Sequence, residues 1–135
     1  MRYIGLDLGT KTLGISISSG VIATNYVTLR HYEDYDYLLE EVSKIVIKEH
    51  IDKIVLGFPK NMNNTIGERA NITLDFKKRL EEKTNLEVIL EDERLTSVVA
   101  NNTMIKADIS RKKRKERVDG VASSIILQSY LDRKV

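Results

Sequence analysis

The sequence has no cysteine, which excludes disulfide bonds and thiolate metal sites and indicates a reducing, cytoplasmic environment. No apolar run approaches the length of a membrane span, and an apolar strand-like stretch follows Met1 directly where a leader would begin with basic residues. We therefore expect no membrane partner. The only proline is Pro59, which ends a short apolar run. The 135 residues give room for one domain, residues 1–135, with a sheet and several helices around one core.

The apolar residues follow two different periods along the chain. Strands are predicted over five stretches, residues 2–8, 13–18, 25–30, 52–58 and 86–90. Helical spacing predicts three helices, over residues 34–50, 67–83 and 118–133. Thr96 or Ser97 is expected to cap one more helix. This order predicts an α/β fold with a mixed five-stranded sheet, in which a three-strand antiparallel meander is joined by parallel strands and flanked by helices.

Three acidic positions stand out against this pattern. Asp7 lies inside the apolar first strand, where a carboxylate is usually paired, hydrogen-bonded or bound to a cation, although a solvated Asp at a strand end is the alternative. Asp92 and Glu93 follow the fifth predicted strand, and the sequence leaves open which of them would be the site residue. Asp119 borders the apolar face of the last predicted helix, where compensation of the helix dipole is the simpler explanation.

These acids are expected to meet at one site, because ligands of such sheets gather outside the carboxyl ends of the strands. Three convergent carboxylates form a hard-oxygen site that suits Mg²⁺ or Mn²⁺. The sequence therefore predicts a divalent metal site built from one acid of each segment.

Four segments in order, residues 4–11, 57–70, 92–97 and 111–131, together resemble the YqgF family, also called RuvX. This is a family of small Holliday-junction-resolvase-like bacterial nucleases in the ribonuclease-H-like superfamily. The resemblance implies a ribonuclease-H-like fold and places the family's acidic triad, as catalytic residues and metal ligands, on Asp7, Glu93 and Asp119. One departure is Ser123, where alanine is common in the family.

The resemblance also implies the activity, which is metal-dependent hydrolysis of phosphodiester bonds with two Mg²⁺ or Mn²⁺ ions. The family is associated with processing of the 5′ end of the small-subunit (16S) rRNA precursor, and resolution of Holliday junctions in DNA is the alternative. The expected partner is therefore nucleic acid, either an rRNA precursor or branched DNA. The protein is expected to be a monomer or a homodimer, and junction cleavage would favour a two-fold dimer.

Basic side chains cluster directly before Asp119. Six of the eight residues from Ser110 to Arg117 are Lys or Arg, and such a run attracts a polyanion, although many charge runs are only solvated. The residues expected to contact nucleic acid are Arg111, Lys112, Lys113, Arg114 and Lys115 of this run, together with Lys11, Lys60, Asn61, Arg69 and Arg94. Asn61 belongs to an Asn-rich segment that is also typical of a simple turn.

Two other classes of function are compatible with parts of the sequence. The Asp-Leu-Gly-Thr segment at residues 7–10 resembles the first phosphate loop of actin-like and sugar-kinase-like ATPases, but that architecture needs two such domains and the chain is too short for both. A non-catalytic nucleic-acid-binding module is the stronger rival. The presence of all three acids argues against it.

Overall fold

The computed structural model describes residues 1–58, 68–92 and 111–134. The strands are β1 (Arg2–Leu8), β2 (Thr12–Ser19), β3 (Ala23–Arg30), β4 (Lys53–Phe58) and β5 (Val88–Asp92). The helices are α1 (Tyr35–Lys48), α2 (Glu68–Thr84) and α4 (Arg111–Lys134). Among these described residues, no helix combines the length and the apolar character that crossing a bilayer requires.

The strands form one five-stranded sheet in the order β3-β2-β1-β4-β5. The pairs β1–β2 and β2–β3 are antiparallel, whereas β1–β4 and β4–β5 are parallel. This confirms the predicted combination of an antiparallel meander with parallel strands. Because β1, β4 and β5 run in the same direction, their carboxyl ends meet at one edge of the sheet.

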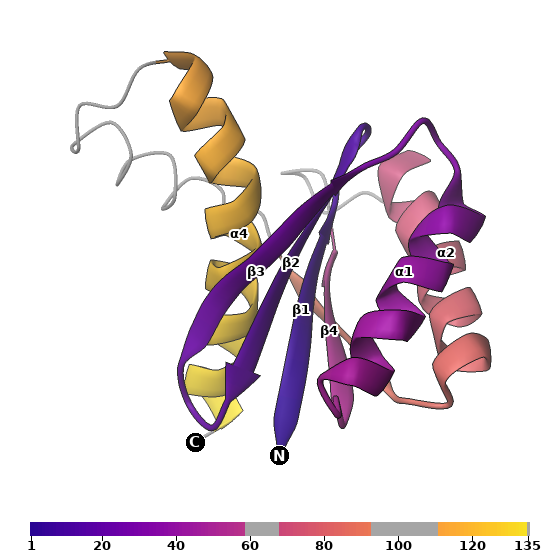
Figure 1. The fold of residues 1–135 in the computed structure, drawn as a ribbon, viewed down its shortest axis with the longest axis vertical. Helices are drawn as coiled ribbons and strands as arrows, with labels where there is room; N and C mark the ends of the chain where they lie inside the picture. The colour runs from indigo at the N-terminus through magenta and orange to yellow at the C-terminus, as the bar shows by residue number, and fades with distance from the viewer. Residues whose placement is uncertain (59–67, 93–110, 135) are drawn as a thin grey trace.

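Helices α1 and α2 cover one face of the sheet, and α4 lies on the other (Figure 1). Helix α1 begins where the side chain of Asp34 accepts a hydrogen bond from the backbone N–H of Tyr37 at 3.0 Å, which satisfies one of the unpaired donors of the first turn. Leu38 and Val42 of α1 and Phe76 of α2 are buried in the main apolar core. The alternating side chains Ile4, Leu6 and Leu8 of β1 enter the same core, so this face carries most of the apolar packing.

Helix α4 packs closely against β1 and β2 because Gly5 has no side chain. A Cβ atom at Gly5 would lie 2.6 Å from Ser16 Oγ and 2.7 Å from Leu127 Cβ, which is too close for either contact. On the same face, the rings of Tyr3 and Tyr130 meet edge to face with centroids 5.7 Å apart. The alternation of β1 therefore places Tyr3, Gly5 and Asp7 on the α4 face of the sheet.

The differences between predicted and observed boundaries that bear on the site are in two elements, and the boundaries of the others shift by at most two residues. Strand β5 runs from Val88 to Asp92 rather than over residues 86–90, so Asp92 belongs to the strand and does not follow it. Helix α4 starts at Arg111 rather than at residue 118, because Arg, Lys and Glu are good helix formers and no proline interrupts them. The basic run from Arg111 onward is thus helical. The helix expected at Thr96 or Ser97 lies outside the described residues.

Candidate active site

Asp7 lies next to the carboxyl end of the central strand and is half-buried. On the adjacent strand β2 its partner is Gly14. On the other side, the register pairs Leu6 with Leu56, so the next position opposite Asp7 is Gly57 of β4. Directly paired residues share one face of a sheet, so both sheet positions beside the Asp7 carboxylate carry no side chain. No side chain of β2 or β4 therefore stands directly beside the carboxylate in the sheet.

Ser123 fastens α4 to the strand that carries Asp7. Its buried hydroxyl donates to the backbone oxygen of Gly5 at 3.0 Å, and the Ser16 hydroxyl donates to the backbone oxygen of Ser123, also at 3.0 Å. The two hydroxyl oxygens are 3.1 Å apart. Sequence reasoning identified Ser123 only as a departure from the family pattern. Its partners are distant in the sequence, so no local signal could have found this network.

Helix α4 runs antiparallel to β1, since Tyr3 contacts Tyr130 whereas Gly5 lies against Ser123 and Leu127. The step from Gly5 to Asp7 is about 6.6 Å along the strand, and one helical turn is about 5.4 Å. Asp119 precedes Ser123 by four residues, so the backbone of α4 brings Asp119 to the end of the sheet where Asp7 lies. The description of α4 between residues 111 and 121 is confined to its backbone, and the side chain of Asp119 lies outside it.

The turn that follows Asp7 is tightly braced. Its ends are joined by a hydrogen bond from the N–H of Gly9 to the oxygen of Thr12 at 2.8 Å. His31, only 3% exposed, contacts the Gly9 oxygen through Nε2 at 3.1 Å and accepts at Nδ1 from the N–H of Glu33 at 3.2 Å. A ring nitrogen that accepts an N–H carries no hydrogen, so Nε2 is the nitrogen that donates to the Gly9 oxygen in this arrangement. His31 therefore serves the backbone of the turn, as a carbonyl-binding side chain.

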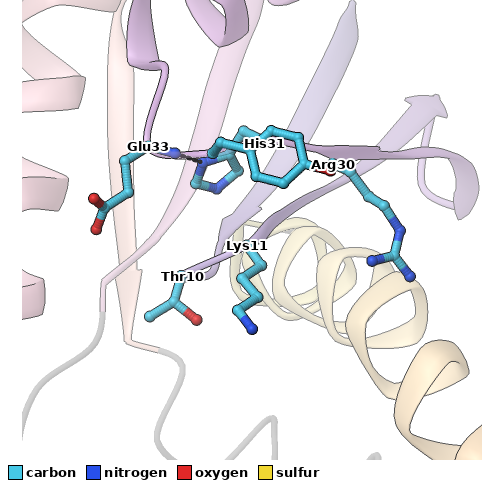
Figure 2. A pocket seen from close by; sticks show the side chains of 6 residues that line it. Thr10, Lys11, Arg30, His31 and Glu33 are labelled. Atoms are coloured by element: carbon cyan, nitrogen blue, oxygen red, sulfur yellow. Dashed lines mark hydrogen bonds between the residues drawn. The ribbon is translucent and has the colours of Figure 1, made fainter.

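Arg69 and Lys11, both expected to contact nucleic acid, lie at this end of the sheet. Arg69, in the first turn of α2, is half-buried and donates from Nη2 to the backbone oxygen of Leu8 at 3.0 Å. Lys11 is exposed at the tip of the turn, and its backbone oxygen accepts from the N–H of His31 at 2.9 Å. Figure 2 shows the Arg30 side chain extending toward α4, while Glu33 extends to the opposite side of His31. Two exposed cations, Lys11 and Arg30, thus line one surface pocket next to the turn that follows β1.

Glu91 is an acid that the sequence analysis did not identify. It is 4% exposed, and its two carboxylate oxygens accept from Arg133 Nη1 and Nη2 at 2.8 and 2.7 Å. This bidentate pair joins the end of β5 to the last turn of α4 and neutralises the buried charge. Ile89 and Glu91 are two residues apart, so they share one face of the strand, and this spacing was the available signal. The predicted strand ended at residue 90, before Glu91.

The remaining predicted site residues lie outside the described residues: Glu93, Lys60, Asn61 and Arg94. The residues Arg111 to Lys115 form the first turns of α4, and their side chains also lie outside the description. Figure 1 shows this N-terminal half of α4 extending beyond the part that packs on the sheet. Within the described part of the chain, no three His, Asp or Glu side chains come together as a metal site. The side chains of Glu93 and Asp119 are not among those described, so this observation does not bear on them.

A sheet of this order with helices on both faces is the ribonuclease-H-like fold. The solved structure "T. thermophilus RuvC in complex with Holliday junction substrate" has a similar fold, with a TM-score of 0.60 at 10% sequence identity, covering 99% of this chain and 96% of that one. A ROK hexokinase from Thermus thermophilus is also similar, with a TM-score of 0.51 at 23% identity, but this chain covers only 38% of it. The kinase likeness is thus restricted to part of a longer chain.

The family model of RuvX, described as "Holliday junction resolvase", matches residues 1–133, so the chain belongs to this family. The chain is 49% identical over 135 residues to a Bacillus subtilis (strain 168) protein named "Putative pre-16S rRNA nuclease", covering 98% of both. A protein of the same name from Geobacillus sp. (strain WCH70) is 48% identical over 137 residues, covering 99% of both. The predicted family is confirmed, and with it the assignment to a family of nucleases.

Proposed function

We propose that this chain, as a single domain over residues 1–135, is a divalent-metal-dependent nuclease that processes the 5′ end of the small-subunit (16S) rRNA precursor in the cytoplasm. The observation that carries the proposal is the position of Asp7. This carboxylate lies at the carboxyl end of the central strand, faces α4 and has glycine at the neighbouring sheet positions on either side. A half-buried carboxylate at the end of the central strand, with no side chain from either neighbouring strand beside it, is suited to hold a cation.

Asp7, Glu93 and Asp119 would form the catalytic and metal-binding triad. Glu91 faces α4, because Arg133 of that helix pairs with it. Glu93 is proposed as the second member on the strength of the family resemblance. The antiparallel course of α4 supports the third member, since it carries the backbone of Asp119 toward the same end of the sheet.

The donor set suits Mg²⁺ or Mn²⁺, which prefer carboxylate oxygens together with water. The chemistry that such ions supply when bound is polarisation of the phosphoryl oxygen and activation of water. The protein's part is to hold the three carboxylates in a fixed arrangement. The rigid links that serve this purpose are the Ser123 network beneath α4 and the braced turn that follows Asp7.

The basic residues would bring the polyanionic substrate to these acids and offset their repulsion of phosphate. Arg111, Lys112, Lys113, Arg114 and Lys115 occupy successive positions at the start of α4. Lys11 and Arg69 lie at the carboxyl end of β1. Lys60, Asn61 and Arg94 are proposed as further contacts on the strength of the family resemblance.

A second candidate is the resolution of Holliday junctions in DNA. It is favoured by the description of the family and by the fold that the chain shares with a junction-bound RuvC. Both candidates use the same acids and the same hydrolysis, so they differ in substrate and not in chemistry. Symmetric cleavage of a junction would also call for a two-fold dimer.

The test is cleavage of a 16S rRNA precursor fragment and of a four-way DNA junction by the purified protein with Mg²⁺ or Mn²⁺. We expect the wild-type protein to cut the 5′ leader of the RNA, and Asp7→Asn to cut neither substrate while still binding RNA in the presence of EDTA. Asp75→Asn is the matched control, because Asp75 is an exposed acid on α2. Cleavage of the junction alone would select the second candidate. If the wild-type protein binds both substrates and cuts neither, the enzyme assignment is wrong and the binding module replaces it.

A further inference from the structure

A surface pocket of about 560 Å³ lies beside the braced turn, and its lining is unusual for an exposed surface. Lys11 comes from the turn between β1 and β2, and Arg30 comes from the end of β3. Tyr32, which also lines the pocket, is 95% exposed. The pocket therefore combines two cations with an aromatic ring that is almost wholly accessible.

The exposure of Tyr32 contrasts with its neighbour Tyr35. The Tyr35 ring packs against His31, with centroids 5.6 Å apart, and against Phe76, with centroids 6.3 Å apart, so it belongs to the fold. The Tyr32 ring contributes no comparable packing, since nearly all of its surface faces solvent. An aromatic side chain in that position offers a large face to a ligand.

The backbone on either side of the pocket is rigid. The N–H of His31, the residue before Tyr32, donates to the oxygen of Lys11 at 2.9 Å, and the His31 ring contacts the Gly9 oxygen at 3.1 Å. These bonds fix the spacing between the strand end that carries Arg30 and Tyr32 and the turn that carries Lys11. A preorganised pocket loses less entropy when a ligand binds.

We propose that this pocket is a subsite for one nucleotide of a single-stranded substrate, in which Tyr32 stacks on the base and Lys11 and Arg30 bind the phosphates on either side. This proposal rests on the proposed nuclease function, because it places the nucleotide beside the bond that is cut. The turn between β1 and β2 connects the pocket to the acidic site, because Lys11 of the pocket follows Asp7 by only four residues. The pocket volume falls within the range of small-ligand sites.

The chemistry of the pocket selects single strands over duplexes. A base inside a duplex is stacked on its neighbours on both sides and cannot present its face to Tyr32, whereas an unpaired base can. Among the described residues, Glu33 is the only acid that lines the pocket, and its carboxylate extends to the side of His31 opposite to Arg30 (Figure 2). Stacking tolerates every base, so the subsite is expected to recognise strandedness and not sequence.

The test is binding of a fluorescently labelled oligouridylate and of a fully paired RNA duplex of the same length, with EDTA present to prevent cleavage. Tyr32→Ala is expected to weaken binding of the single strand by about 5- to 150-fold, which corresponds to the loss of one stacked base, and to leave duplex binding unchanged. Tyr32→Phe keeps the ring and is expected to bind like the wild type. Because Tyr32 is exposed, neither change should disturb the fold.

Two further variants complete the test. Arg30→Gln is expected to lower the slope of log affinity against log salt by about 0.7, the value for one phosphate contact with a single strand. Tyr26→Ala removes a partly exposed tyrosine from the middle of β3, away from the pocket, and serves as the matched control. Unchanged single-strand binding by Tyr32→Ala, or an equal loss for the duplex, would overturn the subsite. The cleavage assay with Asp7→Asn is independent of this binding result, so a failure of the subsite and a failure of the nuclease function are distinguishable.

Discussion

The two faces of the sheet are packed differently. The face under α1 and α2 is closed by large apolar side chains, among which Leu6, Leu38 and Phe76 are almost completely buried. The face under α4 has a smaller apolar cluster. At its centre the contacts with the helix are made by the small or polar residues Gly5, Ser16 and Ser123. The Ser18 hydroxyl on that face is buried without a hydrogen-bond partner among the described residues.

This difference indicates that one face contributes mainly to stability and the other mainly to the position of α4. Apolar burial is non-directional and scales with area, so the α1/α2 face supplies stability that tolerates small shifts. Hydrogen bonds and close backbone contact are directional, so the α4 face fixes one position of the helix relative to β1. Asp7 lies on the α4 face, and the backbone of Asp119 approaches from that helix. The predictions below use single changes on each face to separate stability from positioning.

The largest loss of stability is expected from Phe76→Ala on the α1/α2 face. Removing this ring, which is 1% exposed, should lower the free energy of unfolding by about 3–5 kcal/mol. Cleavage per folded molecule should persist, because the α4 face is untouched. Urea unfolding and activity of the folded fraction measure the two effects. Leu74→Ala, at a partly exposed position of the same helix, is the control and should cost less than about 1 kcal/mol. A specific loss of cleavage in Phe76→Ala would contradict the division between the faces.

Gly5→Ala is expected to affect both stability and cleavage. The new methyl group would clash with Ser16 Oγ and Leu127 Cβ, and α4 would have to move away from β1. Overpacking of this kind costs about 1–3 kcal/mol. Because the helix carries Asp119, we expect the cleavage rate to fall further than the folded fraction does. Adding Ser16→Gly should restore little, since the contact with Leu127 remains. A stable and fully active Gly5→Ala protein would show that close packing of α4 is unnecessary.

Ser123→Ala should have a smaller effect in the same direction. It removes the hydrogen bond to the Gly5 oxygen but keeps the bond that the backbone oxygen of residue 123 accepts from Ser16. The expected cost is about 1 kcal/mol, with a modest loss of cleavage. Ser129→Ala, at a half-buried position of α4, is the matched control. Equal effects of the two substitutions would remove the special role of the Ser123 network.

The smallest effect is expected from Glu40→Gln, at an exposed contact between α1 and α2. Lys83 Nζ lies 3.1 Å from Glu40 Oε2, and this hydrogen bond, with the charge of Lys83, holds the pKa of Glu40 below its usual 4.5. A lowered pKa in the folded state stabilises the protein above the unfolded pKa, and this contribution is lost as the pH falls below 4.5. Wild type and Glu40→Gln should therefore differ slightly in urea midpoint at neutral pH and converge in acid. Convergence at high salt as well would follow from screening of an exposed pair. A gap that widens in acid would contradict this sign.

The comparison between prediction and structure separates local from non-local information. Strand β1 and the start of α1 at Asp34 were predictable, because period and capping are properties of neighbouring residues. The predicted end of strand β5 was wrong, because Glu and Asp, the residue types at positions 91 and 92, are uncommon in strands. The sequence could not reveal that Arg133, distant along the chain, neutralises Glu91 in the strand. The predicted start of helix α4 was also wrong, since the charge run before residue 118 has good helix propensity but was not included in the predicted helix.

The sequence alone determined the kinds of element, their order, the acid at the end of β1 and the family to which the chain belongs. All of these depend on residue identity and short-range spacing. Only the tertiary structure decided that β1 lies between β2 and β4, that glycines flank Asp7 on both sides, and that α4 runs antiparallel to β1 over Gly5. It alone brought Lys11, Arg30 and Tyr32 around one pocket. These features arise from contacts between segments far apart in the chain, which form only when burial and hydrogen bonding of the whole sheet select one arrangement.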